Sequence, residues 1–328
     1  MENLLHSTPS HTSVPSCFVL PSRHLKPATS AAVSLPIIDL SCSHDEVSRA
    51  ILDAGKDFGF FQVVNHGVSE QAMQDMKAVC KEFFQLPMAE KADMYSEDAK
   101  RANRLFSGTV FKTGNVRCWR DCLSLSCSFP VGDSAKEWPD KPHRLREVIG
   151  KFTVLTRGLG MEILRLLCEG MGLGHDYFEG DISGGNVILH VNHYPPCPDP
   201  SLTLGLHPHC DRTIITLLLP SMVPGLEVAY KGDWIKVEAL PNAFVVNFGS
   251  QMEVVTNGLL KSIEHRVTTN SAAVRMTVVT FIRPTADCVV GPAENFVSED
   301  NPPRYPTIAF REFERIYEEN LKNVGKEI

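Results

Sequence analysis

The stretch LHPHCDRTIITLLL, residues 206–219, decides the fold. A histidine and an acid, His209 and Asp211, stand two residues apart near its start. The apolar, β-branched run that follows them predicts a buried strand. Because side chains on a strand alternate between its two faces, we expect His209 and Asp211 to point the same way.

One imidazole and one carboxylate on the same face are two of the three ligands in the 2-His-1-carboxylate triad that holds non-haem Fe(II). The third ligand is expected to be His265, which lies 54 residues after Asp211 in the strand-like run SIEHRV. His207 shares the face of His209 and is an alternative ligand. A surface histidine beside a solvated acid is the plainer alternative, because short motifs need structural context.

The composition is that of an ordinary globular protein with ample material for a core. A formal net charge of −7 argues against nucleic acid or an anionic membrane as a partner. No apolar run is long enough for a transmembrane helix, so we expect no membrane association. The ten cysteines form no Cys-x-x-Cys pair, which indicates reduced thiols and a cytoplasmic protein.

Hydrophobic periodicity divides the chain into two kinds of structure. Before residue 185, strands are expected at 35–40 and 59–67, and helices at 44–58, at 69–86 and at 145–169. After residue 185, short apolar runs alternate with turn residues, a pattern typical of a sandwich or jelly roll. The strands predicted there cover residues 187–194, 214–219, 225–230, 234–238, 243–248, 262–268 and 276–282.

A second chemical pair, Arg275 and Thr277, stands at the start of the last of these strands. At positions i and i+2 the guanidinium and the hydroxyl face the same way, which makes a good clamp for a carboxylate. The alternative is a partner carboxylate within the protein, because a buried arginine needs one.

Taken together, these motifs resemble those of the plant 2-oxoglutarate- and Fe(II)-dependent dioxygenases over about residues 18–318. The chain looks most similar to the specialised-metabolism and hormone branch, near hyoscyamine 6-hydroxylase-like and salicylate-hydroxylase-like members. The motifs that carry the resemblance are LPIIDL (35–40), DFGFFQVVNHG (57–67), NHYPPCP (192–198), His-x-Asp (209–211), VPGL (223–226), His265-Arg266 and Arg-x-Thr (275–277).

The resemblance implies a mainly β fold with flanking helices around a double-stranded β-helix (jelly roll) core. It implies an N-terminal arm (1–34), an α/β region packing on the core (35–184), the core itself (185–285) and a C-terminal helical segment (286–328).

The resemblance also implies roles for single residues. His209, Asp211 and His265 would bind Fe(II). Arg275 and Thr277 would hold the far carboxylate of 2-oxoglutarate, with Tyr194 donating to it and Asn192 nearby. The reaction would consume O2, release succinate and CO2, and hydroxylate, desaturate or epoxidise a small plant metabolite, with ascorbate as a candidate reductant.

Departures from the family pattern point to the substrate. Arg212 follows the proposed metal-binding acid, where small or apolar residues are usual. Arg283 and Phe281 share the strand face of Thr277, and His190 precedes Asn192 by two residues. We therefore expect an anionic or strongly polar substrate, bound by Arg212 or Arg283 near His190, with Phe281 packing on its apolar part. The alternative is that these arginines pair with acids such as Glu253 or Glu264.

Two aromatic residues are expected to form the other wall of the pocket, Phe106 and Trp119, with ordinary core packing as the alternative. Ser250 stands where the family usually has an acid.

Two other functions fit the same metal ligands: a zinc-dependent hydrolase, or a non-catalytic member of the fold that binds small molecules. The Arg275 and Thr277 pair argues for the oxygenase, because a zinc hydrolase needs no second carboxylate site. No coiled-coil heptad is present, so we expect a monomer.

Overall fold

The computed structural model describes residues 4–5, 11–21, 25, 28, 33–108 and 116–323. The predicted arm, 1–34, therefore lies partly outside the described residues. Its described part includes Leu5, whose backbone N–H donates to the Asp121 carboxylate at 3.0 Å, and Phe18, which packs edge-on against Trp119. Across the described ranges, no helix is both long and apolar enough to span a membrane.

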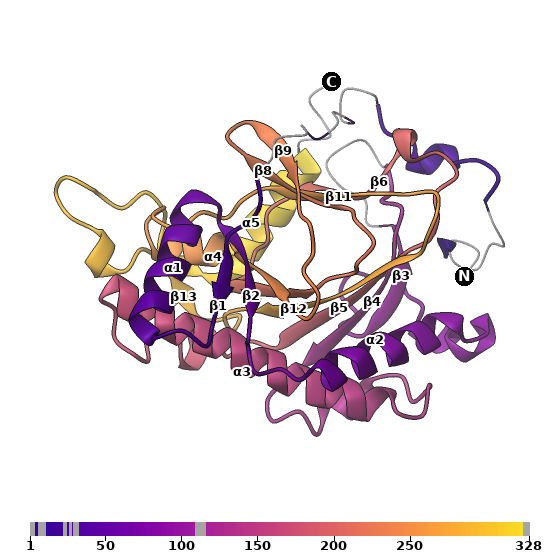
Figure 1. Ribbon diagram of the computed structural model, residues 1–328, viewed down its shortest axis with the longest axis horizontal. Coiled ribbons are helices and arrows are strands. Elements are labelled where there is room, and N and C mark those ends of the chain that lie inside the picture. Colours follow the sequence, from indigo (N-terminus) through magenta and orange to yellow (C-terminus); the bar gives the residue numbers. More distant parts are fainter. Residues whose placement is uncertain are drawn as a thin grey trace.

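Two sheets form the centre of the molecule (Figure 1). The large sheet has eight strands in the order β1-β2-β10-β7-β12-β5-β4-β3, and the small sheet has four in the order β6-β11-β8-β9. The large sheet consists of β1 (Ile37–Asp39), β2 (Phe60–Val64), β10 (Phe244–Phe248), β7 (Ile215–Leu219), β12 (Arg275–Ile282), β5 (Val187–Tyr194), β4 (Asp121–Cys127) and β3 (Arg104–Ser107). The small sheet consists of β6 (Leu204–His209), β11 (His265–Thr268), β8 (Leu226–Tyr230) and β9 (Asp233–Lys236).

Helices flank this core, and the predicted mainly β jelly-roll architecture is confirmed. The helices are α1 (His44–Asp57), α2 (Glu70–Gln85), α3 (Leu145–Met171), α4 (Ser250–Val255) and α5 (Phe310–Asn323). Two short strands, β13 (Val289–Val290) and β14 (Ile308–Ala309), pair with each other outside the two main sheets. The predicted boundary at residues 184–185 runs through the large sheet, because β4 pairs with β5 along its whole length.

The long helices begin and end where their sequences supply caps. Ser43 and Glu46 form a capping box at the start of α1, and the Ser69 hydroxyl accepts from the backbone of Ala72 in α2. Gly172 ends α3 in the left-handed conformation that glycine adopts without strain. The helix runs unbroken through Gly160, where a Cβ would collide with Ile282 of β12. This glycine therefore lets α3 lie close to the sheet.

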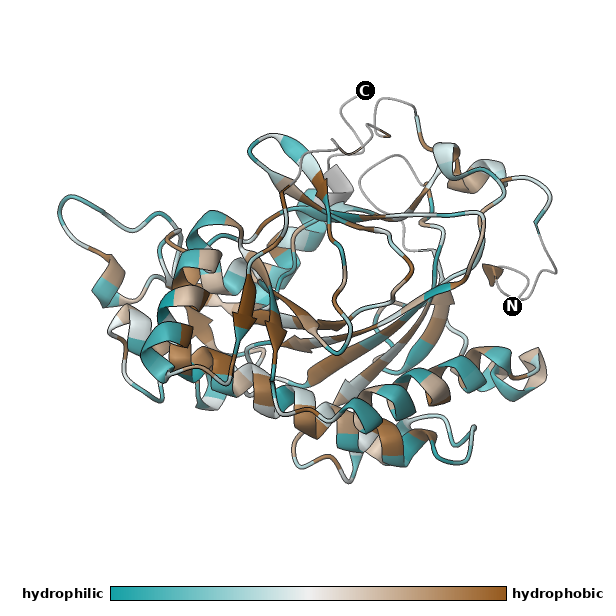
Figure 2. Cartoon of the chain, viewed as in Figure 1, coloured by the Kyte–Doolittle hydropathy of each residue, from teal (hydrophilic) through white to brown (hydrophobic). Residues whose placement is uncertain are grey.

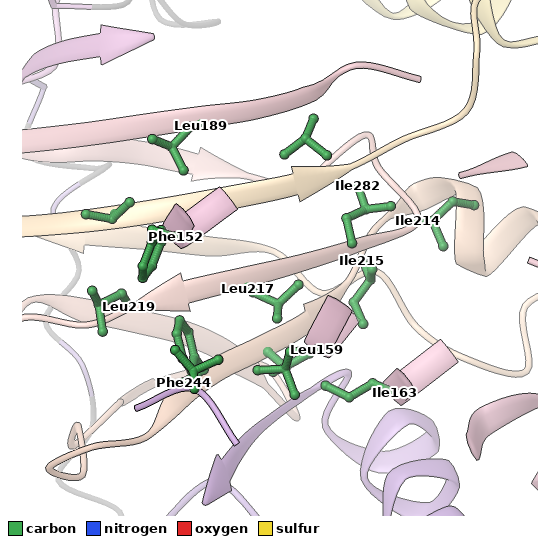
Figure 3. Close-up of a cluster of buried hydrophobic side chains, with 14 of the residues drawn as sticks. Phe152, Leu159, Ile163, Leu189, Ile214, Ile215, Leu217, Leu219, Phe244 and Ile282 are labelled. Atoms are coloured by element: carbon green, nitrogen blue, oxygen red, sulfur yellow. The ribbon is translucent and has the colours of Figure 1, made fainter. Parts of the chain in front are cut away.

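The core lies between α3 and the helix-facing side of the large sheet. Figure 3 shows Phe152, Leu159 and Ile163 of α3 directed into a layer of side chains from β5, β7, β10 and β12. Figure 2 shows the pattern that produces this layer, with apolar residues along the strands and hydrophilic residues on the outer side of the helices. The opposite side of the large sheet faces the small sheet.

The stretch 206–219 is not one strand, contrary to the simplest interpretation of its sequence. His209 ends β6 in the small sheet, and β7 begins at Ile215 in the large sheet. Asp211 therefore lies in the connection between the sheets, and strand alternation does not set its direction. The chain must leave one sheet to enter the other, and the connecting residues adopt no strand geometry.

Replacing Phe152 with alanine is expected to destabilise the protein by about 3–5 kcal/mol, because the ring is 1% exposed and its loss leaves a cavity. Leu155→Ala on the same helix is the matched control, since Leu155 is 39% exposed. Chemical denaturation measures both free energies of unfolding. Similar values for the two variants would contradict this account of the core.

Candidate active site

Three metal-binding side chains meet at the edge of the small sheet. His209 and His265 are register partners on the antiparallel strands β6 and β11, and their rings lie 4.2 Å apart. The Nε2 atoms of His209 and His265 lie 3.8 Å and 3.7 Å from Oδ1 of Asp211. Within the described part of the chain, these residues form the one group of three or more histidine, cysteine or acidic side chains able to hold a metal ion.

Hydrogen bonds turn the ligand atoms toward a common point. Nδ1 of His209 lies 2.8 Å from the backbone oxygen of His207, and Nδ1 of His265 lies 3.2 Å from that of Ile263. Since a carbonyl only accepts, both Nδ1 atoms must carry the proton, and both Nε2 atoms keep a lone pair for a metal. The structure thus brings His209, and not His207, to the ligand cluster.

The carboxylate of Asp211 is divided between two tasks. Its Oδ2 accepts from the Thr216 hydroxyl at 2.7 Å and from the Asn247 amide at 2.9 Å, which leaves Oδ1 directed at the two histidines. Burial opposes ionisation of Asp211, but the neighbouring histidines and these hydrogen bonds lower its pKa below the ordinary value. The pKa of His209 is lowered by burial and by His265. A neutral imidazole and an ionised carboxylate are the forms that bind Fe(II), so the residues fit that ion.

Ser250 holds the backbone of Asp211 in place. Its N–H and its hydroxyl both donate to the Asp211 carbonyl oxygen, at 2.7 Å and 3.0 Å. The residue that departs from the family pattern therefore supports the connection between the sheets. Sequence reasoning missed this role, along with those of Thr216 and Asn247, because nothing in their local patterns points to Asp211.

Replacing Thr216 with valine is expected to weaken metal binding about 10- to 100-fold, because the Asp211 carboxylate loses a hydrogen bond that orients it. Thr280→Val is the control, since its buried hydroxyl donates to Thr156. Metal titration followed by calorimetry compares the two variants. Equal affinities would show that the Thr216 hydroxyl does not orient the ligand.

Arg275 and its neighbours form a second polar site on the large sheet. Arg275 pairs with Tyr194 across β12 and β5, and its guanidinium lies 5.1 Å from the Tyr194 ring centre. In the next pair along, the Asn192 amide donates to the Thr277 hydroxyl at 3.4 Å. Asn192 also accepts from Arg120, a buried residue that sequence reasoning missed.

Arg275 is suited to an incoming carboxylate. It is 3% exposed, yet its Nε and Nη1 atoms have no hydrogen-bond partner among the described residues. Burial lowers its pKa, a cost that a bound anion would offset. The expected alternative, an internal carboxylate partner, is not found among the ion pairs of the described chain. These observations fit the dicarboxylate 2-oxoglutarate.

Two glycines leave space for this clamp. A Cβ at Gly205 would lie 2.7 Å from the Tyr194 ring, and one at Gly225 would lie 3.0 Å from the Arg275 side chain. Gly225 belongs to the VPGL motif, so close packing against Arg275 gives a physical reason for that glycine.

A cavity of about 1620 Å³ lies between the two sheets and contains both sites. It is lined by all three metal-binding residues, by Arg275, Thr277, Tyr194 and Asn192, and by five of the six residues predicted for the substrate pocket, His190, Arg212, Phe281, Arg283 and Phe106.

Trp119, the sixth, lies elsewhere, which corrects the prediction that it forms a wall of the pocket. Its fully buried ring packs with Leu5, Phe18 and Cys197, and its Nε1–H donates to the Pro195 carbonyl at 3.0 Å. Trp119 precedes β4 and its backbone bonds to Leu204, so its side chain anchors the N-terminal segment. A buried tryptophan is equally suited to either place, and the sequence offers no signal to choose between them.

Arg212 and Arg283 contact the C-terminal helix α5. The Arg212 guanidinium lies 5.1 Å from the Tyr317 ring centre, and Arg283 pairs with Glu314 at 3.3 Å and lies over Phe310. Arg283 therefore has an acidic partner, although neither Glu253 nor Glu264 provides it.

The chain matches two protein-family models and is similar to solved structures. The model of the 2OG-Fe(II) oxygenase superfamily matches residues 185–284, and that of the non-haem dioxygenase in morphine synthesis N-terminal region matches residues 35–145. The crystal structure of JOX2 in complex with 2OG, Fe and JA is 35% identical, with a TM-score of 0.84 over 94% of this chain and 90% of that chain.

Two barley proteins show the likeness over the whole chain. The 2'-deoxymugineic-acid 2'-dioxygenase of Hordeum vulgare is 63% identical over 339 residues, which is 100% of each chain. The mugineic-acid 3-dioxygenase of the same plant is 56% identical over 100% of this chain and 96% of that protein. Hyoscyamine 6-dioxygenase of Hyoscyamus niger, the kind of relative expected from the motifs, is 39% identical over 86% and 85%.

Proposed function

Because this chain belongs to the 2-oxoglutarate- and Fe(II)-dependent oxygenases, we propose that it hydroxylates an anionic acid of the mugineic-acid type. The family is that of dioxygenases acting on small plant metabolites, which removes the zinc hydrolase as an alternative. The observation that carries the choice of substrate is the charge of the cavity. Seven lysine and arginine side chains line it against four carboxylates, although the chain as a whole has a net charge of −7.

The residues around the cavity divide the work of the reaction. His209, Asp211 and His265 would hold Fe(II), while Arg275, Thr277 and Tyr194 would grip the far carboxylate of 2-oxoglutarate, with Asn192 beside it. When bound, the iron with 2-oxoglutarate and O2 supplies the oxidising power, and succinate and CO2 are released. The protein orients the reactants and keeps water away from them.

The relatives suggest which acid is oxidised. One is named for the 2' position of 2'-deoxymugineic acid and the other for position 3 of mugineic acid. We propose 2'-hydroxylation, in line with the higher identity to the first relative. His190, Phe281 and Phe106 are proposed to contact this substrate from the large sheet.

The test uses the full chain with Fe(II), 2-oxoglutarate, ascorbate and either acid. Succinate release with 2'-deoxymugineic acid, matched by one equivalent of a product heavier by one oxygen atom, is the expected result. Turnover of mugineic acid alone would contradict the 2' assignment. Succinate release that neither acid stimulates would overturn the proposed substrate class.

The cellular compartment and the oligomeric state of the protein are further proposals. All ten cysteines are free thiols, which supports a reducing compartment, and we propose the cytoplasm. We propose a monomer, to be tested by light scattering coupled to gel filtration.

A further inference from the structure

The cavity side of the large sheet presents its side chains in cross-strand rows. Arg275 and Tyr194 are opposite each other in the first row, and Thr277 and Asn192 in the second. Both rows belong to the co-substrate clamp. Because successive residues on one face of a strand are two apart, each row lies about 7 Å from the previous one.

The third row contains polar groups that the clamp does not use. Val279 pairs with His190, His190 with Ser124, and Ser124 with Arg104, so the row runs across β12, β5, β4 and β3. All four side chains line the cavity. The row thus places a guanidinium, a hydroxyl and an imidazole beside the clamp, facing the same space.

The guanidinium of Arg104 is positioned without being neutralised. It lies 4.0 Å from the centre of the Phe106 ring and donates to the Ser96 carbonyl at 3.4 Å. It forms no ion pair with any acid in the described chain; burial lowers its pKa, and the charge of nearby Asp98 offsets only part of that effect. A stacked, half-buried arginine that forms no ion pair is suited to bind a carboxylate.

His190 supplies neutral hydrogen-bonding capacity beside it. Its ring packs edge-on against Phe281 at 5.1 Å, and its nitrogens bond to no other described residue. Burial, together with Arg120 and Arg104, lowers the pKa of His190 to about 3. At neutral pH the ring therefore offers one donor and one acceptor. The Ser124 hydroxyl, likewise, makes no hydrogen bond within the described chain.

We infer that Arg104, Ser124 and His190 form the substrate-binding row of this enzyme, with Arg104 binding a carboxylate of the substrate. This inference rests on the proposed function and gives its anionic substrate a specific anchor. It shifts the anchor away from Arg212 and Arg283, whose contacts with Tyr317, Glu314 and Phe310 hold α5 at the cavity instead.

The decisive variant is Arg104→Gln, which keeps a polar side chain and removes the charge. We expect the KM for 2'-deoxymugineic acid, and its Kd by anaerobic calorimetry with Fe(II) and 2-oxoglutarate present, to rise about 10- to 100-fold. The KM for 2-oxoglutarate should stay unchanged. Arg104→Lys, which restores the charge without the planar fork, should recover part of the loss.

Arg157→Gln is the matched control. Arg157 also lies over a phenylalanine, 4.8 Å from the Phe129 ring centre, but it is on α3 and outside the cavity. The Arg157→Gln variant should keep the KM and the Kd for 2'-deoxymugineic acid within about twofold of wild type. Equal melting temperatures for the two glutamine variants would exclude misfolding as the cause of weaker binding in Arg104→Gln.

A second experiment identifies the group that Arg104 binds. Each carboxylate of the substrate is converted in turn to an uncharged carboxamide, and Kd is measured with wild type and Arg104→Gln. For one derivative, the affinity for wild type should be about 10-fold or more below that of the parent acid. For the Arg104→Gln variant, the same derivative and the parent acid should bind with almost equal affinity. Equal losses against both proteins for every derivative would overturn the row.

The outcomes separate the inference from the proposed function. If wild type oxidises 2'-deoxymugineic acid and Arg104→Gln does so with the same KM, the row is wrong and the proposed function stands. If wild type oxidises neither acid, the proposed function falls. The substrate-binding row is then tested with the acid that stimulates succinate release in a screen of carboxylic acids, by comparing Arg104→Gln with Arg157→Gln.

Discussion

Arg275→Gln is expected to raise the Kd for 2-oxoglutarate by at least about 100-fold. The guanidinium is buried and two of its nitrogens lack a partner in the described protein, so a carboxylate would gain two charge-assisted hydrogen bonds there. At about 1.5–3 kcal/mol for each bond, their loss corresponds to a change of about 10² to 10⁴ in affinity.

Anaerobic titration of the Fe(II)-loaded protein with 2-oxoglutarate measures this effect through the metal-to-ligand absorption band. Arg283→Gln is the control, because Arg283 lines the same cavity and is paired with Glu314. Arg275→Lys should fall between wild type and the glutamine variant, since it keeps the charge and loses the fork. An unchanged Kd in Arg275→Gln would remove the clamp from the proposed site.

Asp211→Asn is expected to abolish Fe(II) binding and to lower kcat by more than about 10³-fold. The substitution keeps an oxygen that can accept from Thr216 and Asn247, but it turns an uncharged amide toward the metal. An amide NH2 has no lone pair to donate, and the only anionic ligand of the triad is lost.

Metal binding can be followed without activity, by the rise in melting temperature that Mn(II) produces. A ligand at 100 times its Kd stabilises the native state by about 2.7 kcal/mol, so wild type should respond clearly and Asp211→Asn should not. His209→Gln and His207→Gln form the matching pair. The first should lose the response and the second keep it, and the opposite result would show that the wrong histidine was chosen as the ligand.

The sequence was informative where local patterns decide the structure. The alternation in 187–194 and 276–282 predicted β5 and β12, and it placed Arg275 and Thr277 on one face, as the structure has them. Ser69 predicted the start of α2 for the reason that the structure shows, a hydroxyl that accepts from Ala72.

The rest depends on contacts between residues distant in the chain. His209 and Asp211 do converge, but the irregular connection after β6 and the hydrogen bonds from Ser250 to the Asp211 carbonyl bring Asp211 into place rather than the strand periodicity. Arg104 is distant in sequence from His190, and only the pairing of β3, β4 and β5 brings them into one row. Periodicity within a strand carries no information about its neighbours.

The arrangement of side chains in separate cross-strand rows affects how the substrate selectivity of such an enzyme can change. The groups proposed to bind 2-oxoglutarate stand at 275, 194, 277 and 192, while those at 104, 124 and 190, proposed to bind the substrate, stand one step further along the same surface. Exchange of three side chains, each on a different strand, can therefore retune selectivity while the oxidising machinery stays intact. Laboratory evolution toward new acids would best begin by randomising those three positions together.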